Sequence, residues 1–264
     1  MHPRRSLSRW RLLLVAPRTG AENMARDSAL QARAARNGET VFSVYSWSRP
    51  TLSLGRNQPA VGLYDMKKIR DAEIDIVRRP TGGRAILHNR EVTYSVTAPI
   101  DSGSLRETYG RINRILQLGL RQLGVFVEAA GRAERAEVPS ARPCFDVPGE
   151  GELVAGSAKL IGSAQWRENG ALLQHGSILV DDDQSSLPDL SSSLRATNGS
   201  IPQPATLHAL LGRAPDPEEV ARAMFDAVRS LEDAEATEIA EDDLRSDALK
   251  LVPHFLNEDW TWRR

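Results

Sequence analysis

The chain has 264 residues, 41% of them hydrophobic, which is enough to bury a sizeable core in one large domain or two small ones. Its 34 basic and 35 acidic side chains leave a formal net charge of -1, so no global charge favours nucleic acid or an anionic membrane surface. The single cysteine excludes an internal disulfide, and no apolar run approaches the roughly 20 residues that cross a bilayer. We therefore expect a cytoplasmic protein.

In the N-terminal half, runs with strand patterns alternate with runs of helical spacing. Apolar residues at helical spacing predict a helix over 22–36, which Asn37-Gly38 ends, and a second helix over 105–123. Between two β-rich runs, residues 80–88 are expected to form a loop. Strands are expected at 12–16, 40–47, 51–54, 74–79, 91–98 and 125–128.

In the C-terminal half, Asn169-Gly170 between two β-rich runs predicts a hairpin. Asp216-Pro217-Glu218-Glu219 supplies an N-cap, a proline at the first helical position and an acid at the third, which predicts a helix to about residue 231. Residues 181–205 are rich in Ser, Asp and Pro and predict a surface loop. Further strands are expected at 152–155, 159–166 and 171–180, and a last helix at 241–255.

These elements predict an α+β protein with mixed, largely antiparallel sheets and packed helices. Residues 1–205 would form the catalytic core, and residues 206–264 a C-terminal helical extension packed on it.

The lone cysteine, Cys144, lies in Arg142-Pro143-Cys144-Phe145-Asp146, upstream of Lys159 in a segment of small residues. A thiol with an ordinary pKa of ~8.5 is mostly protonated at neutral pH, so a nearby cation would help it to ionise and attack. The pair predicts acyl transfer through a thioester on Cys144. Lys159 could hold the thiolate, polarise the thioester carbonyl or relay a proton, and the sequence leaves these roles open. Without its neighbours, a lone cysteine is more often a small buried hydrophobe.

Glycines supply the second candidate feature. Gly82 and Gly83 lack Cβ atoms, so their backbone can approach an acyl chain closely and offer N–H donors to an oxyanion, although Thr-Gly-Gly alone is more often a turn. Gly162-Ser163-Ala164 keeps the wall beside Lys159 small, and His175-Gly176 would shape the far side of the pocket. The acyl slot is expected to be lined by Leu54, Leu87 and Ile161.

Several motifs together resemble the biotin/lipoate protein ligase and octanoyltransferase superfamily: Arg78-Arg79-Pro80-Thr81-Gly82-Gly83-Arg84-Ala85-Ile86-Leu87-His88, Glu91-Val92-Thr93-Tyr94-Ser95, the Lys159 segment and Gln174-His175-Gly176-Ser177-Ile178-Leu179. Arg84 after the double glycine and the placing of Cys144 resemble the cysteine-dependent octanoyltransferases of the LipM type more than the ATP-dependent lipoate ligases. The resemblance implies the ligase catalytic-domain fold, with Cys144 and Lys159 as catalytic residues. The implied binding residues are Arg79, Thr81, Gly82, Gly83, Arg84, His88, Gly162, Ser163, Ala164, His175 and Gly176. Of these, His88 and His175 are expected to form hydrogen bonds rather than to act as acid or base.

The resemblance also implies partners: an octanoyl acyl carrier protein as donor and a lipoyl-domain protein, such as glycine cleavage H protein, as acceptor. It implies a monomer that needs no metal, nucleotide or organic cofactor. Both partners are typically acidic, so we expect a basic rim formed by Arg78, Arg79, Arg84, Arg111 and Arg114.

Three other functions stay open from the sequence. An ATP-dependent lipoate ligase would use Lys159 to bind the carboxylate or acyl-adenylate. A lipoyl amidotransferase would move acyl groups between two lipoyl-domain proteins. A non-catalytic acyl-binding or lipoyl-domain-binding protein would bind stoichiometrically without turnover.

Overall fold

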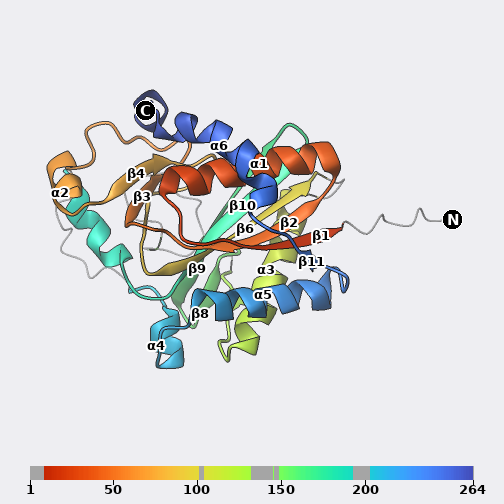
Figure 1. The fold of residues 1–264 in the computed structure, drawn as a ribbon. Helices are drawn as coiled ribbons and strands as arrows, with labels where there is room; N and C mark the ends of the chain where they lie inside the picture. The colour runs from red at the N-terminus through yellow and green to blue at the C-terminus, as the bar shows by residue number, and fades with distance from the viewer. Residues whose placement is uncertain (1–8, 101–103, 132–144, 146–148, 193–202, 264) are drawn as a thin grey trace.

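The computed structural model describes residues 9–100, 104–131, 145, 149–192 and 203–263. Cys144 lies outside the described residues. Eight strands form the main sheet in the order β11-β1-β2-β6-β10-β9-β8-β7 (Figure 1). β11, β1 and β2 pair in parallel, and the remaining neighbours are antiparallel. The bounds are β1 Trp10–Leu14, β2 Thr40–Tyr45, β6 Glu91–Pro99, β7 Glu128–Ala129, β8 Leu153–Ala155, β9 Ala158–Glu168, β10 Ala171–Leu179 and β11 Thr237–Glu238.

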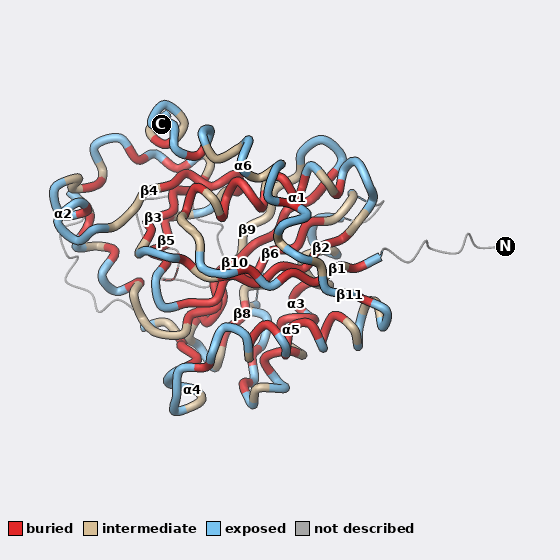
Figure 2. The backbone as a smooth tube through the Cα atoms, viewed as in Figure 1, coloured by how far each residue is buried: buried red, intermediate tan, exposed pale blue. Residues whose placement is uncertain are grey.

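Helices cover both faces of this sheet, which confirms the predicted α+β class. In Figure 1, α1 and α6 lie over one face, and α3 and α5 lie over the other. Side chains alternate along each strand, so Leu12 packs toward α3 and α5 whereas Leu13 packs toward α1 and α6. Figure 2 shows the buried backbone concentrated in the sheet and on the inner helix sides. The bounds are α1 Gly20–Asn37, α3 Leu105–Gln122, α4 Leu207–Leu211, α5 Pro217–Leu231, α6 Asp242–Leu256 and α7 Glu258–Thr261. None of the helices among the described residues is both long and apolar enough to cross a membrane.

Local capping fixes the helix ends, and α1 begins at Gly20, two residues before the predicted start. Thr19 accepts a hydrogen bond from the Glu22 amide while the Glu22 carboxylate returns to Thr19, and Gly38 closes α1 in the left-handed conformation at φ 71°. Asp216 caps α5 as expected, with Pro217 as its first residue. The two-residue turn Asn169-Gly170 joins β9 and β10 with positive φ at both positions, which confirms the hairpin.

A second, three-stranded sheet lies beside the first and carries the loop that includes Gly82 and Gly83. Its order is β4-β3-β5, with bounds β4 Asp75–Arg78, β3 Thr51–Leu54 and β5 Ile86–His88. The prediction that residues 80–88 form only a loop is wrong at its end, because residues 86–88 pair with β3. A three-residue strand carries too little periodicity to be seen in a sequence.

Three further expectations are corrected. Of the strand expected at 125–128 only Glu128 pairs, as the first residue of β7, while Val125 and Val127 are buried in the core under α3. The surface loop expected from residue 181 contains a 3₁₀ helix, Gln184–Leu190, whose Leu187 and Leu190 are buried against the small sheet. The sequence analysis also missed α2, Met66–Asp71, a single short helix capped by Asp65.

The segment after residue 205 packs on both faces of the main sheet. α5 lies against α3, α6 lies against α1, and β11 adds an edge strand beside β1. The boundary at residue 205 stays a prediction.

The contact between the two glycine segments of the small sheet gives a first testable prediction. A Cβ on Gly55 would lie 1.9 Å from the carbonyl oxygen of Gly83, so Gly55→Ala must displace the backbone of that loop. We expect Gly55→Ala to lower the free energy of unfolding by about 3 kcal/mol. Gly110→Ala is the matched control, because a Cβ there meets nothing within 4 Å inside α3 and should stabilise by up to about 1 kcal/mol. Urea unfolding of both variants checks this, and equal stability of the two would contradict it.

Candidate active site

Lys159 on β9 forms a buried ion pair. It is 2% exposed, and its Nζ lies 2.7 Å from Oε2 of Glu152, just before β8. The same carboxylate oxygen accepts a hydrogen bond from the Gly149 amide at 2.6 Å. β8 and β9 are paired strands, which explains how the two charges meet. Burying two charges is costly unless they are paired, so this pair marks a candidate functional position.

Phe145, the residue that follows Cys144, lies against Lys159. The centre of its ring is 4.7 Å from Lys159 Nζ, within the range of a cation–π contact. Phe145 is 3% exposed and packs with Ile86 of β5 and Leu179 of β10. The ring is therefore held between the small sheet, the main sheet and the lysine.

Two glycines make room on opposite faces of the sheet near Lys159. A Cβ on Gly162 would lie 3.1 Å from Cε of Lys159 and 3.2 Å from the Phe145 ring, so Gly162 leaves the space that the lysine tip occupies. A Cβ on Gly176 would lie within 2.7 Å of both Ser163 Oγ and the Tyr94 ring. Small residues were predicted to keep the wall beside Lys159 small, and at Gly162 the tip of Lys159 and the Phe145 ring fill the space that a side chain would need.

Strand register decides which of the predicted residues share a face with Lys159. Residues directly opposite in an antiparallel pair lie on the same face, and Gly162 and Ala164 pair with Ser177 and His175. This face receives the tip of Lys159 and, through His175, the loop that contains Thr81.

Ser163 lies on the opposite face from Lys159. The Tyr94 hydroxyl accepts from Gln174 at 2.8 Å, so its own hydrogen points to Ser163 Oγ at 2.7 Å. Burial raises the pKa of Tyr94 to about 12, which keeps this donor protonated. Ser163 therefore supports the sheet behind the site.

Arg79 fixes the loop that contains Gly82 and Gly83 through hydrogen bonds from its buried guanidinium. Arg79 is 3% exposed, and its guanidinium donates to the carbonyl oxygens of Gly82 at 2.7 Å and Arg84 at 2.7 Å, and to Ser53 on β3. A Cβ on Gly82 would meet nothing within 4 Å, and Gly83 is exposed with φ 95°. Arg79 therefore shapes the loop, while the Gly82 and Gly83 backbone stays accessible.

His175 connects this loop to the core of the protein. Its Nε2 lies 2.6 Å from Thr81 Oγ1, and its Nδ1 lies 2.9 Å from Oδ2 of Asp27 on α1. Asp27 also accepts from Tyr45 and Ser95, at 2.9 Å each. Burial raises the pKa of Tyr45 well above its usual range, so Tyr45 keeps the proton it donates. The Asp27 carboxylate accepts a hydrogen bond from Nδ1–H of His175, so Nε2 of the ring accepts one from the Thr81 hydroxyl.

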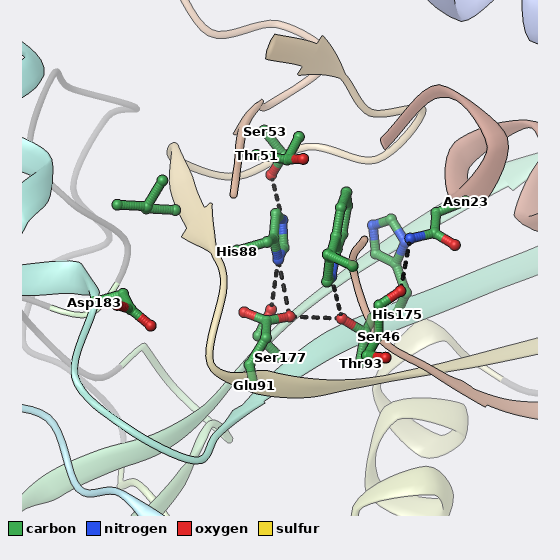
Figure 3. A network of polar contacts seen from close by, with 12 residues as sticks. Asn23, Ser46, Thr51, Ser53, His88, Glu91, Thr93, His175, Ser177 and Asp183 are labelled. Carbon is green, nitrogen blue, oxygen red and sulfur yellow. Dashed lines mark hydrogen bonds and ion pairs between the residues drawn. The ribbon is translucent and has the colours of Figure 1, made fainter. Parts of the chain in front are cut away.

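His88 forms a second buried network beside the first, shown in Figure 3. Its Nε2 lies 2.7 Å from Ser53 Oγ, which already accepts from Arg79, so the serine donates to the ring. Its Nδ1 then donates to Glu91 Oε1 at 2.9 Å. The ring stacks on Trp47, with centroids 3.9 Å apart. His88 is 5% exposed, and both of its nitrogens are engaged, in agreement with the hydrogen-bonding role expected for it.

The state of His88 gives a prediction for pH dependence. Burial lowers its pKa below the ordinary 6.5, so the folded protein holds the neutral ring while the unfolded chain binds the proton first. The stability that depends on neutral His88 is complete above pH 6.5 and is lost as the pH falls from there, by up to about 1.4 kcal/mol per pH unit. We expect His88→Gln to be less stable than wild type at pH 7.5 and to lose less stability on acidification.

Urea midpoints at pH 7.5 and 5.5 test this, with His208→Gln as control because the His208 side chain is 53% exposed. An equally steep acid loss in His88→Gln and wild type would contradict the assignment.

Two expectations about surfaces are corrected. Arg78 and Arg79 cannot belong to a basic rim, because they are 0% and 3% exposed and donate to backbone carbonyls. Arg111 on α3 is paired with Glu232. The proposed acyl lining does not form one wall either: Leu54 and Leu87 belong to the core of the small sheet, whereas Ile161 belongs to the core under α3 and α5.

The sequence analysis missed Glu152 and Asp27, the two carboxylates that orient Lys159 and His175. Glu152 could have been suspected from its place at the start of the strand before Lys159, but Asp27 is far from His175 in the chain. Among the described residues, no group of three or more His, Cys, Asp and Glu side chains could hold a metal ion.

Comparisons with known proteins agree with this geometry. Residues 19–229 match the model of the lipoyl protein ligase A/B catalytic domain family. Octanoyltransferase LipM of Kyrpidia tusciae is 37% identical over 97% of this chain and 99% of its own length. Octanoyltransferase LipM of Carboxydothermus hydrogenoformans is 42% identical over 66% of each chain. Protein Ta0514 of T. acidophilum, solved with bound lipoic acid, has the same fold, with a TM-score of 0.79 at 22% identity over 97% of this chain and 99% of that one. The resemblance and the ligase catalytic-domain fold predicted from the sequence are thus confirmed, and the chain belongs to the lipoyl protein ligase A/B catalytic domain family.

Proposed function

We propose that this protein is an octanoyltransferase of protein lipoylation, which moves an octanoyl group from acyl carrier protein through a thioester on Cys144 to a lysine of a lipoyl domain. The activity is that of the LipM relatives, one of which is 37% identical over 97% of this chain. The acyl-enzyme, its donor and its acceptor are the parts of the proposal that experiment must decide.

One observation supports the thioester route most strongly. Phe145 is joined to Cys144 by one peptide bond, and its ring lies 4.7 Å from the Nζ of the buried Lys159. Consecutive Cα atoms are about 3.8 Å apart, so the only thiol of the chain is tethered next to the residue that contacts the buried cation. A positive charge nearby favours the thiolate, which is the attacking form of cysteine.

The proposed reaction has two balanced steps. The Cys144 thiolate attacks the carbonyl carbon of the donor thioester, a new C–S bond forms, the C–S bond to the carrier breaks, and the carrier leaves as a thiolate that takes a proton from solvent. A lysine amine of the acceptor then attacks the same carbon, an amide bond forms, the C–S bond to Cys144 breaks, the Cys144 thiolate leaves, and the amine proton passes to solvent. Each step passes through an oxyanion, which needs donors in place.

Named residues fill the supporting roles. The Glu152 carboxylate opposite Lys159 suits a charged ammonium, so we assign Lys159 the electrostatic role, on the thiolate and the oxyanion, rather than the proton relay. The backbone of Gly82 and Gly83 would approach the acyl group from the loop that Arg79 and His175 hold. Arg84, Ala164 and Gly162 would complete the surroundings of the acyl group.

The partners follow from the same proposal. An octanoyl acyl carrier protein would supply the thioester, and a lipoyl-domain protein such as glycine cleavage H protein would supply the lysine. Another structural neighbour is a bi-partite lipoate protein ligase of Thermoplasma acidophilum described together with its E2 lipoyl domain, which is consistent with an acceptor of this kind.

The donor requirement separates transferase from ligase. The experiment incubates an apo lipoyl domain with the protein and one of three donors, and follows the added octanoyl mass on the domain. The donors are octanoyl acyl carrier protein without ATP, free octanoate with ATP, and a second, octanoylated lipoyl domain without ATP. We expect modification only from the carrier-bound octanoyl group. Modification that requires ATP and free acid would identify a ligase, octanoyl transfer from a modified lipoyl domain alone would identify an amidotransferase, and binding without any modification would overturn catalysis.

A further inference from the structure

A chain of three buried side chains connects helix α1 with the loop that contains Gly82 and Gly83. Asp27 on α1 and Thr81 in the loop are both 0% exposed, and His175 on β10, which lies between them, is 6% exposed. Oδ2 of Asp27 lies 2.9 Å from Nδ1 of His175, and Nε2 of the same ring lies 2.6 Å from Oγ1 of Thr81. The three residues are far apart in the sequence, so only the folded protein brings them together.

Asp27 sets the direction of each hydrogen bond in this chain. An ionised carboxylate only accepts, and Asp27 already accepts from Ser95 through Oδ1 and from Tyr45 through Oδ2. His175 therefore donates to Asp27 from Nδ1, which leaves a lone pair on Nε2 for the Thr81 hydroxyl. Through the tautomer of His175, Asp27 thus fixes where the Thr81 side chain points.

The backbone on either side of Gly82 is fixed as well. The Thr81 carbonyl oxygen accepts from the Arg56 amide at 2.8 Å. In a planar trans peptide unit the C=O and the N–H that follows it point in opposite directions, so the Gly82 N–H points away from Arg56. The Gly82 carbonyl oxygen accepts from Arg79 at 2.7 Å, so the Gly83 N–H points away from that guanidinium.

These two glycine amides are available to a ligand. Neither N–H donates to an acceptor among the residues that the structure describes. Gly82 is half-buried and Gly83 is exposed. Backbone N–H groups that already point in a fixed direction stabilise an oxyanion without reorganising during the reaction. Whatever holds Thr81 in place therefore also holds the Gly82 donor.

We propose that Asp27 is a positioning residue for acyl transfer, which fixes Thr81 through His175 and so sets the direction of the Gly82 amide. Asp27, His175 and Thr81 act through the loop rather than on the reacting atoms. The inference rests on the proposed function, because the Gly82 amide has a catalytic use only if an acyl group is transferred beside it.

The Thr81 hydroxyl is the link that can be removed with the least change of shape. We expect Thr81→Val to lower the rate constant of adduct formation from octanoyl acyl carrier protein by roughly 10- to 100-fold, because a misdirected donor stabilises the oxyanion poorly. The donor KM should change by less than about threefold, since this contact is made in the transition state. Single-turnover mass spectra give this rate constant, and misfolded protein lowers only their amplitude.

Two further variants separate positioning from packing. Thr81→Ser restores the hydroxyl and should recover most of the rate. Thr97→Val is the matched control, because Thr97 is also 0% exposed and its hydroxyl has no hydrogen-bond partner among the described residues. The same loss of a buried hydroxyl should there leave the rate equal to that of wild type.

Asp27→Asn tests the start of the chain. An amide presents both an acceptor and a donor to Nδ1, so it no longer holds His175 in one tautomer. Nitrogen NMR of the imidazole should show hydrogen on Nδ1 alone in wild type and partly on Nε2 in Asp27→Asn. The heteronuclear NOE of the Gly82 amide, which reports fast motion, should fall in Asp27→Asn and Thr81→Val but not in Thr97→Val.

Three results would overturn the inference. They are adduct formation by Thr81→Val at the wild-type rate, a wild-type His175 with its hydrogen on Nε2, and a Gly82 amide that is equally rigid in wild type, Asp27→Asn and Thr81→Val. Thr81→Val carries the test alone if Asp27→Asn does not fold. The NMR measurements need no activity, so a wild type that forms no adduct would refute the proposed function while the spectra still decide whether Asp27 positions the loop.

Discussion

Lys159→Met is expected to lower the rate of octanoyl transfer by roughly 10³-fold, because it removes the charge proposed to hold the thiolate and the oxyanion. Methionine keeps most of the side-chain volume, so the space beside Gly162 stays filled. The rate of appearance of octanoylated lipoyl domain measures the effect. Lys67→Met is the matched control, because the Lys67 side chain is 79% exposed, and its rate should equal that of wild type.

A structural role for Lys159 must be separated from a catalytic one. Removing one partner of a buried ion pair leaves the other charge unpaired, at a cost of about 3–5 kcal/mol, so Lys159→Met alone should also destabilise the fold. The double variant Lys159→Met with Glu152→Gln removes both charges and should recover stability. We expect it to stay inactive. Recovery of activity together with stability would show that Lys159 only supports the fold.

Cys144→Ala is expected to abolish transfer, with a loss of roughly 10⁴-fold or more, the scale found when a covalent nucleophile is removed. Cys144→Ser should be nearly as slow, because a serine hydroxyl without a general base stays protonated and attacks poorly. Transfer is followed as for Lys159, and thermal melting of the three proteins serves as the control for folding. Transfer by Cys144→Ala at a rate close to wild type would exclude the thioester route.

Much of the fold could be predicted because its signals are local. The N-cap Asp216 with Pro217, the closing Gly38 and the hairpin pair Asn169-Gly170 each lie within a few residues of the element they define. β5 and the 3₁₀ helix could not be predicted in this way. Their residues are ordered by contacts with β3 and with the small sheet, which are set by tertiary packing.

The candidate site shows the same contrast between features with a local signal in the sequence and features set by tertiary contacts. Residue types pointed to Lys159 and to the small residues beside it, because both can be seen in the sequence, and their catalytic and binding roles stay predictions. The residue types did not predict that Arg79 would be buried and support the loop with hydrogen bonds, because the exposure of an arginine depends on the fold. The partners Glu152 and Asp27 are identified only when strands and helix are assembled.

The acyl-enzyme itself is the central claim, and the mass of the intact protein tests it most directly. Wild type and Cys144→Ala are incubated with octanoyl acyl carrier protein without ATP. The mass of each intact protein is measured before and after addition of an apo lipoyl domain. The account predicts one octanoyl adduct on wild type, none on the variant, and loss of the adduct as the lipoyl domain gains the octanoyl mass. A lipoyl domain that is octanoylated at the wild-type rate while no adduct forms on Cys144 would contradict it.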